Sequence, residues 1–143
     1  MPALKSEGRP AHEARLRVRY AETDQMRVVY YANYIIWMEV GRVELCRSIG
    51  FNYRDMEKDD GILLAVAECH CRYLCPARFD DEVIVKAWIA SANTRMVRFE
   101  YEMRRSEDDR VLATGHTAHI FCTPDLRRTR LPAKYHALFG VSE

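Results

Sequence analysis

The stretch that decides the fold is "NYIIWMEVGRVELCRSI", residues 33–49. Apolar side chains recur there at helical spacing and form two stripes. The first stripe holds Tyr34, Ile35, Met38, Leu45, Cys46 and Ile49, and the second holds Ile36, Val40 and Val43. Because this helix is apolar on nearly every side, we expect it to be largely buried. Asn33 is a candidate N-cap, and Gly50 is suited to end the helix.

The segments on either side of this helix alternate between apolar and polar residues, as strands do. The expected strands are residues 15–20, 62–74, 82–90, 95–105 and 111–122, with a hairpin turn at 106–110. Residues 52–61 are polar and are expected to form an irregular or weakly helical connection. One strand, a helix and then four antiparallel strands predict an α+β fold. A single sheet does not readily cover a helix that is apolar on two sides, which favours an oligomer.

Composition restricts the class of protein. At 143 residues the chain fits one domain, and a formal net charge of +1 gives no global field for nucleic acid or anionic membranes. No apolar run is long enough to span a membrane. Residues 1–14 are polar and lack the apolar core of a signal peptide, so we expect a flexible lead-in followed by a single domain over residues 15–143.

The cysteines indicate a reduced, cytoplasmic protein. There are five, an odd number, and they lie in apolar segments rather than at the spacings of a disulfide framework. Cys69, Cys71 and Cys75 surround His70, but a structural zinc site usually takes its ligands from tight turns that converge, so we expect no metal. His116 and His119 are three residues apart in a strand and therefore should point to opposite faces.

Several common catalytic motifs are missing from the sequence. There is no Gly-x-Ser-x-Gly elbow, no Gly-x-Gly-x-x-Gly turn and no P-loop. Ser–His–Asp hydrolysis, dinucleotide binding and P-loop nucleotide hydrolysis are therefore not supported.

Asp24 is the residue that first suggests chemistry. It lies in a loop, nine residues before Asn33, and an aspartate in such a place is most often a turn residue. However, the N-terminus of the following helix carries unsatisfied N–H groups that can polarise a carbonyl. A carboxylate within reach could attack that carbonyl or activate a water molecule. An easily attacked carbonyl, such as that of a thioester, suits so modest a nucleophile.

The segment "YAETDQMRVVYYANYIIWMEVGR", residues 20–42, resembles the signature of hotdog-fold acyl-CoA thioesterases related to 4-hydroxybenzoyl-CoA thioesterase. The resemblance continues through "AECHCRYLCPARFDDEV" (67–83) and "ATGHTAHIF" (113–121), and covers roughly residues 15 to 135. It implies a curved antiparallel β-sheet wrapped around one long central helix. It also implies a homodimer or homotetramer with active sites at subunit interfaces, and no cofactor, because coenzyme A is part of the substrate.

The same resemblance implies roles for individual residues. Asp24 matches the catalytic carboxylate, and Tyr31 occupies a position where many members have His and others have Tyr. Many members have Gly where this chain has Arg27. The other positions of the motif, which shape the thioester pocket, are Tyr30, Asn33 and Tyr34.

A second set of residues is implied for coenzyme A. The stretch "SANTR", residues 91–95, aligns with a turn that contacts the nucleotide in related enzymes. Arg95 is then the leading phosphate contact, with Asn93 and Thr94 as helpers, because a guanidinium matches the geometry of a phosphate. Arg127 and Arg128 are reserve candidates.

Three functions remain open from the sequence. The first is an acyl-CoA thioesterase of unspecified acyl group, with Asp24 as nucleophile or general base. The second is a hotdog hydratase or dehydratase, which would need a catalytic His near the helix, although no His lies between residues 13 and 69. The third is a non-catalytic acyl-CoA binding protein.

Overall fold

The structure is a computed structural model that describes residues 9–141, so residues 1–8 of the expected lead-in lie outside the described part. The strands are β1 (Ala11–Arg17), β2 (Leu63–Tyr73), β3 (Glu82–Ala92), β4 (Met96–Arg105) and β5 (Arg110–Cys122). The helices are α1 (Asn33–Ile49), α2 (Tyr53–Asp60) and α3 (His136–Phe139), with 3₁₀ turns η1 (Tyr20–Glu22) and η2 (Ala133–Tyr135). None of the helices in residues 9–141 is long and apolar enough to cross a membrane.

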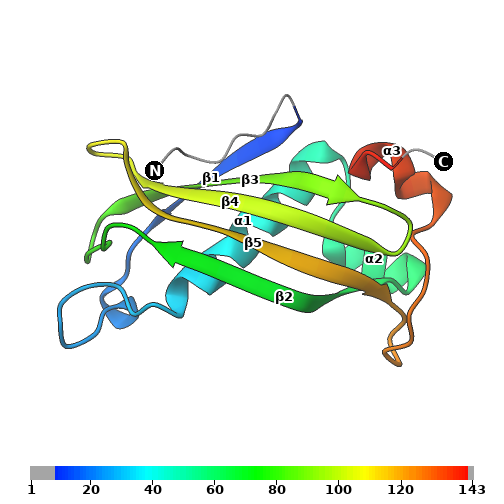
Figure 1. Cartoon of the computed structure of the whole chain (residues 1–143), viewed down its shortest axis with the longest axis horizontal. Coiled ribbons are helices and arrows are strands. Elements are labelled where there is room, and N and C mark those ends of the chain that lie inside the picture. Colours follow the sequence, from blue (N-terminus) through cyan, green and yellow to red (C-terminus); the bar gives the residue numbers. More distant parts are fainter. Residues whose placement is uncertain (1–8, 142–143) are drawn as a thin grey trace.

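The five strands form one antiparallel sheet in the order β1-β3-β4-β5-β2, with β1 and β2 at its edges (Figure 1). The helix α1 lies against one face, over β1, β3 and β4. This confirms the expected sequence of a strand, a helix and four antiparallel strands. The first strand begins at Ala11 rather than at residue 15, because Ala11 pairs with Trp88 at the start of the β1–β3 ladder.

One side of α1 forms the centre of the core. Trp37, Met38 and Leu45 are buried against the sheet, and a Cβ at Gly41 would lie 2.6 Å from Val85 Cγ1. The glycine therefore lets the helix backbone approach β3 closely. The expectation of a helix buried on nearly every side is wrong for its other flank, because one sheet covers one side only. The exposed apolar residues of that flank are Ile35, Ile36 and Val40.

The two ends of α1 differ from each other in how well the sequence predicts them. Gly50 has φ 118° and ends the helix in the left-handed conformation, as expected. The N-cap is Ala32, so the assignment of Asn33 as N-cap is wrong. The side-chain amide of Asn33 instead donates to the carbonyl of Glu22 at 2.8 Å. The Asn33 side chain therefore bonds the loop before the helix and does not cap the helix.

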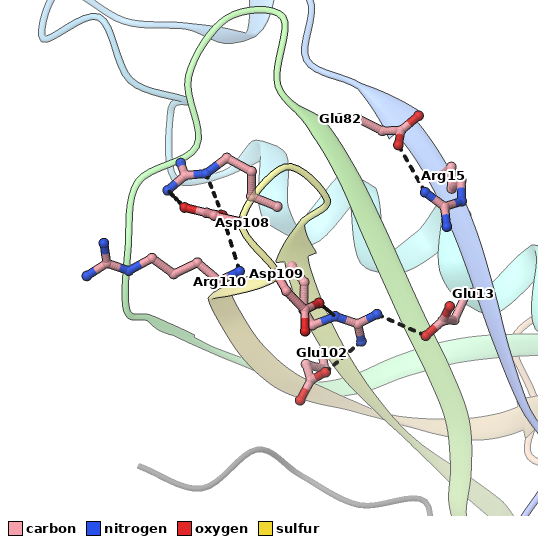
Figure 2. A network of polar contacts seen from close by, with 9 residues as sticks. Glu13, Arg15, Glu82, Glu102, Asp108, Asp109 and Arg110 are labelled. Atoms are coloured by element: carbon pink, nitrogen blue, oxygen red, sulfur yellow. Dashed lines mark hydrogen bonds and ion pairs between the residues drawn. The ribbon is translucent and has the colours of Figure 1, made fainter.

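A polar network ties the sheet together on the face away from α1 (Figure 2). The guanidinium of Arg104 binds Glu13 of β1 at 3.1 Å, Glu102 of its own strand at 2.9 Å and Asp109 of the β4–β5 hairpin at 2.9 Å. Pairs that reach water contribute at most about 1 kcal/mol each. The network therefore connects the edge strand β1 to β4 but adds little to the stability of the fold.

Candidate active site

Asp24 lies in a tight turn between η1 and α1. Its amide donates to the Val28 carbonyl and its carbonyl accepts from the Arg27 amide, both at 2.9 Å. Its Oδ1 accepts from the Met26 amide at 2.8 Å, which is the local role expected of a turn aspartate. The other carboxylate oxygen, Oδ2, has no hydrogen-bond partner among the described residues. Asp24 is thus both a turn residue and a carboxylate with one oxygen available.

Arg27 is in the left-handed conformation, with φ 64°. This is a conformation that glycine adopts without cost and that other residues adopt with strain. A glycine, which the resemblance implies for many members at this position, would adopt it without strain. The turn keeps its shape in this chain in spite of the arginine.

Glu22 connects this turn to α1, a role that the sequence did not predict. Its Oε1 accepts from the Arg19 amide at 2.8 Å and its Oε2 from the Trp37 indole at 3.1 Å. Its backbone carbonyl accepts from the Tyr30 amide and from the Asn33 side chain, both at 2.8 Å. The only hint in the sequence was that a buried Trp needs an acceptor for its indole N–H.

The environment of Glu22 favours the carboxylate form. Burial alone would raise the pKa of Glu22. The hydrogen bonds from the Arg19 amide and from Trp37, together with the nearby Arg19 guanidinium, outweigh burial, and the pKa lies below its ordinary value. The carboxylate therefore stays charged and keeps its bonds at neutral pH.

A cavity of about 320 Å³ opens beside Asp24. Six of its lining residues are Asp24, Tyr31, Tyr34, Tyr73, Leu74 and Cys75. The Tyr34 hydroxyl accepts from the Ala77 amide at 3.0 Å, and burial raises the pKa of Tyr34 above its ordinary value. The rings of Tyr34 and Tyr73 meet edge to face with centroids 5.1 Å apart. The walls are mostly apolar and aromatic, and they place one carboxylate at the edge of an apolar space.

The predicted motif residues separate into three groups. Asp24, Tyr31 and Tyr34 line the cavity. The ring of Tyr30 packs against that of Tyr31 in a tilted arrangement with centroids 4.7 Å apart, and the pKa of Tyr30 is raised by the Tyr31 hydroxyl and, less, by the charge of Asp24. Asn33 is bonded to Glu22 and does not line the cavity. Site prediction missed Tyr73, Leu74 and Cys75, because they follow Asp24 by about 50 residues and come together with it only in the fold.

The first backbone amides of α1 already have hydrogen-bond acceptors, unlike those of a helix with a free N-terminus. The N–H groups of Asn33, Tyr34 and Ile35 each donate to the carbonyl three residues earlier, at 2.9, 3.3 and 3.2 Å. Within the described residues, the amides of Tyr31 and Ala32 have no acceptor. The backbone donors available to a substrate therefore precede the first turn of α1.

A second cavity, of about 360 Å³, lies at the other end of the sheet. It is lined by Arg95, Met96, Ile120, Arg128, Thr129 and Arg130. Figure 1 shows that the β3–β4 turn and the loop before α1 are at opposite ends of the sheet. The register agrees, because Tyr73 pairs with Ala113 and Leu63 with Cys122, and the ten intervals along β2 span roughly 33 Å.

The residues predicted to bind coenzyme A therefore do not join Asp24 within one chain. Arg95 lines the second cavity. The Asn93 side chain accepts from the amides of Arg95 and Met96 at 2.8 and 3.0 Å, and so shapes the turn. The Thr94 carbonyl accepts from the Leu131 amide at 2.8 Å. Of these three residues, Arg95 alone lines the second cavity.

The histidines and cysteines lie apart from both cavities, with the exception of Cys75. In residues 9–141, no three His, Cys, Asp or Glu side chains are grouped so that they could hold a metal ion. His116 bonds Glu68 at 2.7 Å, whereas His119 is buried and bonds Thr117 at 2.8 Å, so the two histidines do point to opposite faces. Burial lowers the pKa of His119 to about 4, so it is neutral.

Several known proteins that resemble this chain are named as thioesterases. A crystal structure of a DHNA-CoA thioesterase from Staphylococcus aureus superposes with a TM-score of 0.87 at 30% identity, over 91% of this chain and 89% of that one. An acyl-acyl carrier protein thioesterase of Arabidopsis thaliana is 28% identical over 90% of this chain and 67% of its own. The YneP protein of Bacillus subtilis (strain 168) is 47% identical over 78 residues, which are 54% of this chain and 56% of YneP. That match therefore spans little more than half of the relative. The sequence model of the thioesterase-like superfamily matches residues 18–137, and the chain belongs to this superfamily, as the motif resemblance implied.

Proposed function

We propose that the protein is an acyl-CoA thioesterase whose acyl group lies in the Asp24 cavity. The observation that carries the proposal is the position of Asp24, which lines an apolar, aromatic cavity and has one carboxylate oxygen without a partner in the described chain. The Staphylococcus aureus relative is named as a thioesterase of DHNA-CoA, and this supports an acyl-CoA substrate here.

The arrangement suits attack on a thioester carbonyl. The amides of Tyr31 and Ala32 would donate to the carbonyl oxygen as it gains negative charge, and the N-terminal end of α1 would add its partial positive charge. Asp24 would then act in one of two ways. It would attack the carbonyl carbon and displace the coenzyme A thiolate, leaving an anhydride that water hydrolyses, or it would take a proton from the water that attacks. The Tyr31 side chain would pack on the acyl group or donate a hydrogen bond.

The arginine cavity suits the phosphates of coenzyme A. Arg95, Arg128 and Arg130 line it, and guanidinium groups bind phosphate oxygens in a fork. Since the two cavities lie at opposite ends of β2, they would serve one acyl-CoA only if a second copy brings its arginine cavity beside this Asp24.

A homo-oligomer would meet that requirement. In the described chain, β2 is an edge strand, and Ile35, Ile36 and Val40 of α1 are exposed. Antiparallel pairing of two β2 edges would place the Leu63 end of each copy near the Tyr73 end of the other. The second copy would also cover the open flank of α1, which would complete the family arrangement of a curved sheet wrapped around a central helix. A dimer or a tetramer fits, and light scattering measures which one forms.

The proposal is tested by following thiol release from short-chain, long-chain and aromatic acyl-CoAs. We expect catalysed release from at least one class, with no addition of water to an enoyl-CoA, because no histidine among the described residues lines the Asp24 cavity. Tight binding across the panel without thiol release would instead identify a non-catalytic acyl-CoA binding protein. In a single turnover, a trapped acyl-enzyme would identify Asp24 as the nucleophile, and its absence would favour the general base.

A further inference from the structure

Tyr73 reaches from the edge strand to the loop that precedes α1. It is the last residue of β2, and its hydroxyl donates to the backbone carbonyl of Tyr31 at 2.9 Å. The two residues are 42 positions apart in the sequence. Among the described residues, this is the one side-chain hydrogen bond to the Tyr31 carbonyl, and the carbonyl also accepts from the Tyr34 amide at 3.3 Å. The tyrosine hydroxyl thus makes the shorter of the two bonds.

The ring of Tyr73 is held from two sides. It meets the Tyr34 ring at 88° and the Tyr31 ring at 90°, with centroids 5.1 and 6.4 Å apart. Tyr34 is only 3% exposed and is itself fixed by the Ala77 amide. Edge-to-face contacts of this kind favour one ring orientation. The ring contacts therefore hold the Tyr73 hydroxyl in one position, although Tyr73 itself is partly exposed.

The hydroxyl remains a donor throughout the working range of pH. Burial, followed by the neighbouring Cys71, raises the pKa of Tyr73 well above its ordinary value. Ionisation of the phenol would remove the proton that the Tyr31 carbonyl accepts. A raised pKa excludes that loss near neutral pH.

The Tyr31 carbonyl and the Ala32 amide belong to one planar peptide unit. In a trans unit the C=O and N–H bonds point in opposite directions, so a bond that fixes the carbonyl also fixes the direction of the N–H. The Ala32 amide is one of the two that have no acceptor in the described chain. Fixed donors stabilise developing charge without reorganising during the reaction, which is where their value for catalysis lies.

We propose that Tyr73 is a positioning residue: its hydroxyl holds the Tyr31–Ala32 peptide so that the adjacent free amide faces the thioester carbonyl in a constant direction. The role rests on the proposed thioesterase function. Tyr73 acts through the backbone of the loop, and Asp24 performs the chemistry. The edge strand β2 thereby contributes to turnover and not to the cavity wall alone.

Kinetics of Tyr73→Phe test this role, because the change keeps the ring and removes the hydroxyl. We expect kcat to fall about tenfold while KM changes by less than about twofold, since the lost effect belongs to the transition state. The matched control is Tyr135→Phe, whose hydroxyl donates to Asp60 and lines neither cavity; its kcat should be unchanged. para-Aminophenylalanine at position 73 restores a donor on the same ring and should recover most of the lost kcat.

An NMR measurement tests the hydrogen bond without any substrate. Tyr is followed by Ala only at 20–21 and 31–32, so labelling Tyr with ¹³C at the carbonyl and Ala with ¹⁵N gives two signals in a carbonyl–amide correlation spectrum. In Tyr73→Phe we expect the Tyr31–Ala32 signal to move and the Tyr20–Ala21 signal to stay. If Tyr73→Phe does not fold, O-methyltyrosine at position 73, which cannot donate, carries the same expectation.

The outcomes separate this role from the proposed function. Absence of thiol release by the unaltered protein contradicts the function. An unmoved Tyr31–Ala32 signal overturns the positioning role, and so does an unchanged kcat or a raised KM with full kcat, which would leave Tyr73 as a wall of the cavity only.

Discussion

At the end of the sheet where β2 finishes, Asp24 borders a cavity walled by tyrosines, whereas at the end where β2 begins three arginines line a second cavity of similar size. The first cavity is built from the loop before α1 and the chain that follows β2. The second is built from the β3–β4 turn and the segment after β5. The two differ in charge as well as in wall chemistry.

Under the proposed function, this difference would match the two halves of an acyl-CoA. An acyl chain or ring is best bound by apolar and aromatic walls, and phosphates are best bound by guanidinium groups. If the proposal holds, the chain separates the chemistry of the thioester from the binding of the nucleotide. Each substitution below alters one of the two cavities or its surroundings and leaves the other cavity unchanged.

The largest effect is expected from Asp24→Asn, which keeps the size of the side chain and the acceptor for the Met26 amide. Loss of the carboxylate as nucleophile or base should lower kcat for thiol release by about 10³-fold or more, with the fold retained by circular dichroism. Asp59→Asn, a change at an exposed position of α2, is the control. Turnover near that of the control would show that Asp24 is a turn residue only.

Next in size is the effect of replacing Arg95 and Arg128 together by Ala. The KM for acyl-CoA should rise about tenfold or more, with little change in kcat, because the phosphate contacts are made equally in the ground state and the transition state. The same thioester carried on pantetheine, which lacks the nucleotide, should show no change. Arg54→Ala on α2 is the control, and equal KM increases for both substrates would place the arginines outside nucleotide binding.

Glu22→Gln weakens the contacts that the Glu22 carboxylate makes between the Asp24 turn and α1. We expect a loss of about 1–3 kcal/mol in the free energy of unfolding at pH 7, because two hydrogen bonds to a charged acceptor and the ion pair with Arg19 are weakened. The pKa of Glu22 is lower in the folded protein than its ordinary value of 4.5, so its stabilisation is present above that value and is lost as pH falls through the folded pKa. Urea unfolding should therefore show that the difference in free energy of unfolding between the unaltered protein and Glu22→Gln shrinks as the pH falls. A difference that does not change with pH would contradict the stabilising role of the Glu22 carboxylate.

The smallest effect is expected from Arg27→Gly, at φ 64°. Relief of the left-handed strain should raise the free energy of unfolding by about 0.5–1 kcal/mol, with thiol release changed less than about twofold. Gln25→Gly in the same turn lacks a positive φ and should not stabilise. Equal changes in melting temperature for the two variants would mean that the conformation of Arg27 carries no strain.

The sequence predicts the features that depend on local pattern. Helical spacing located α1, alternation located the strands, and the position of Gly50 located the end of the helix. The Asp24 motif identified a carboxylate that does line a cavity. These features are predictable because each depends on residues within a few positions of one another.

The features that were missed depend on contacts between distant residues. Asn33 serves as a donor to Glu22 rather than as a cap, and Tyr73 reaches the Tyr31 carbonyl across 42 positions. Likewise, the sequence does not indicate how far Arg95 lies from Asp24 within one chain. The direction of the strands places them at opposite ends of the sheet, and only the topology reveals this.

The division of one acyl-CoA between two copies is tested most directly by mixing subunits. Neither Asp24→Asn nor Arg95→Glu/Arg128→Glu should hydrolyse acyl-CoA efficiently at low concentration. A hybrid of the two contains one site with an intact Asp24 and intact arginines from the other copy, so it should regain about half of the unaltered activity per dimer. A hybrid no more active than the sum of the two parent variants would contradict the account.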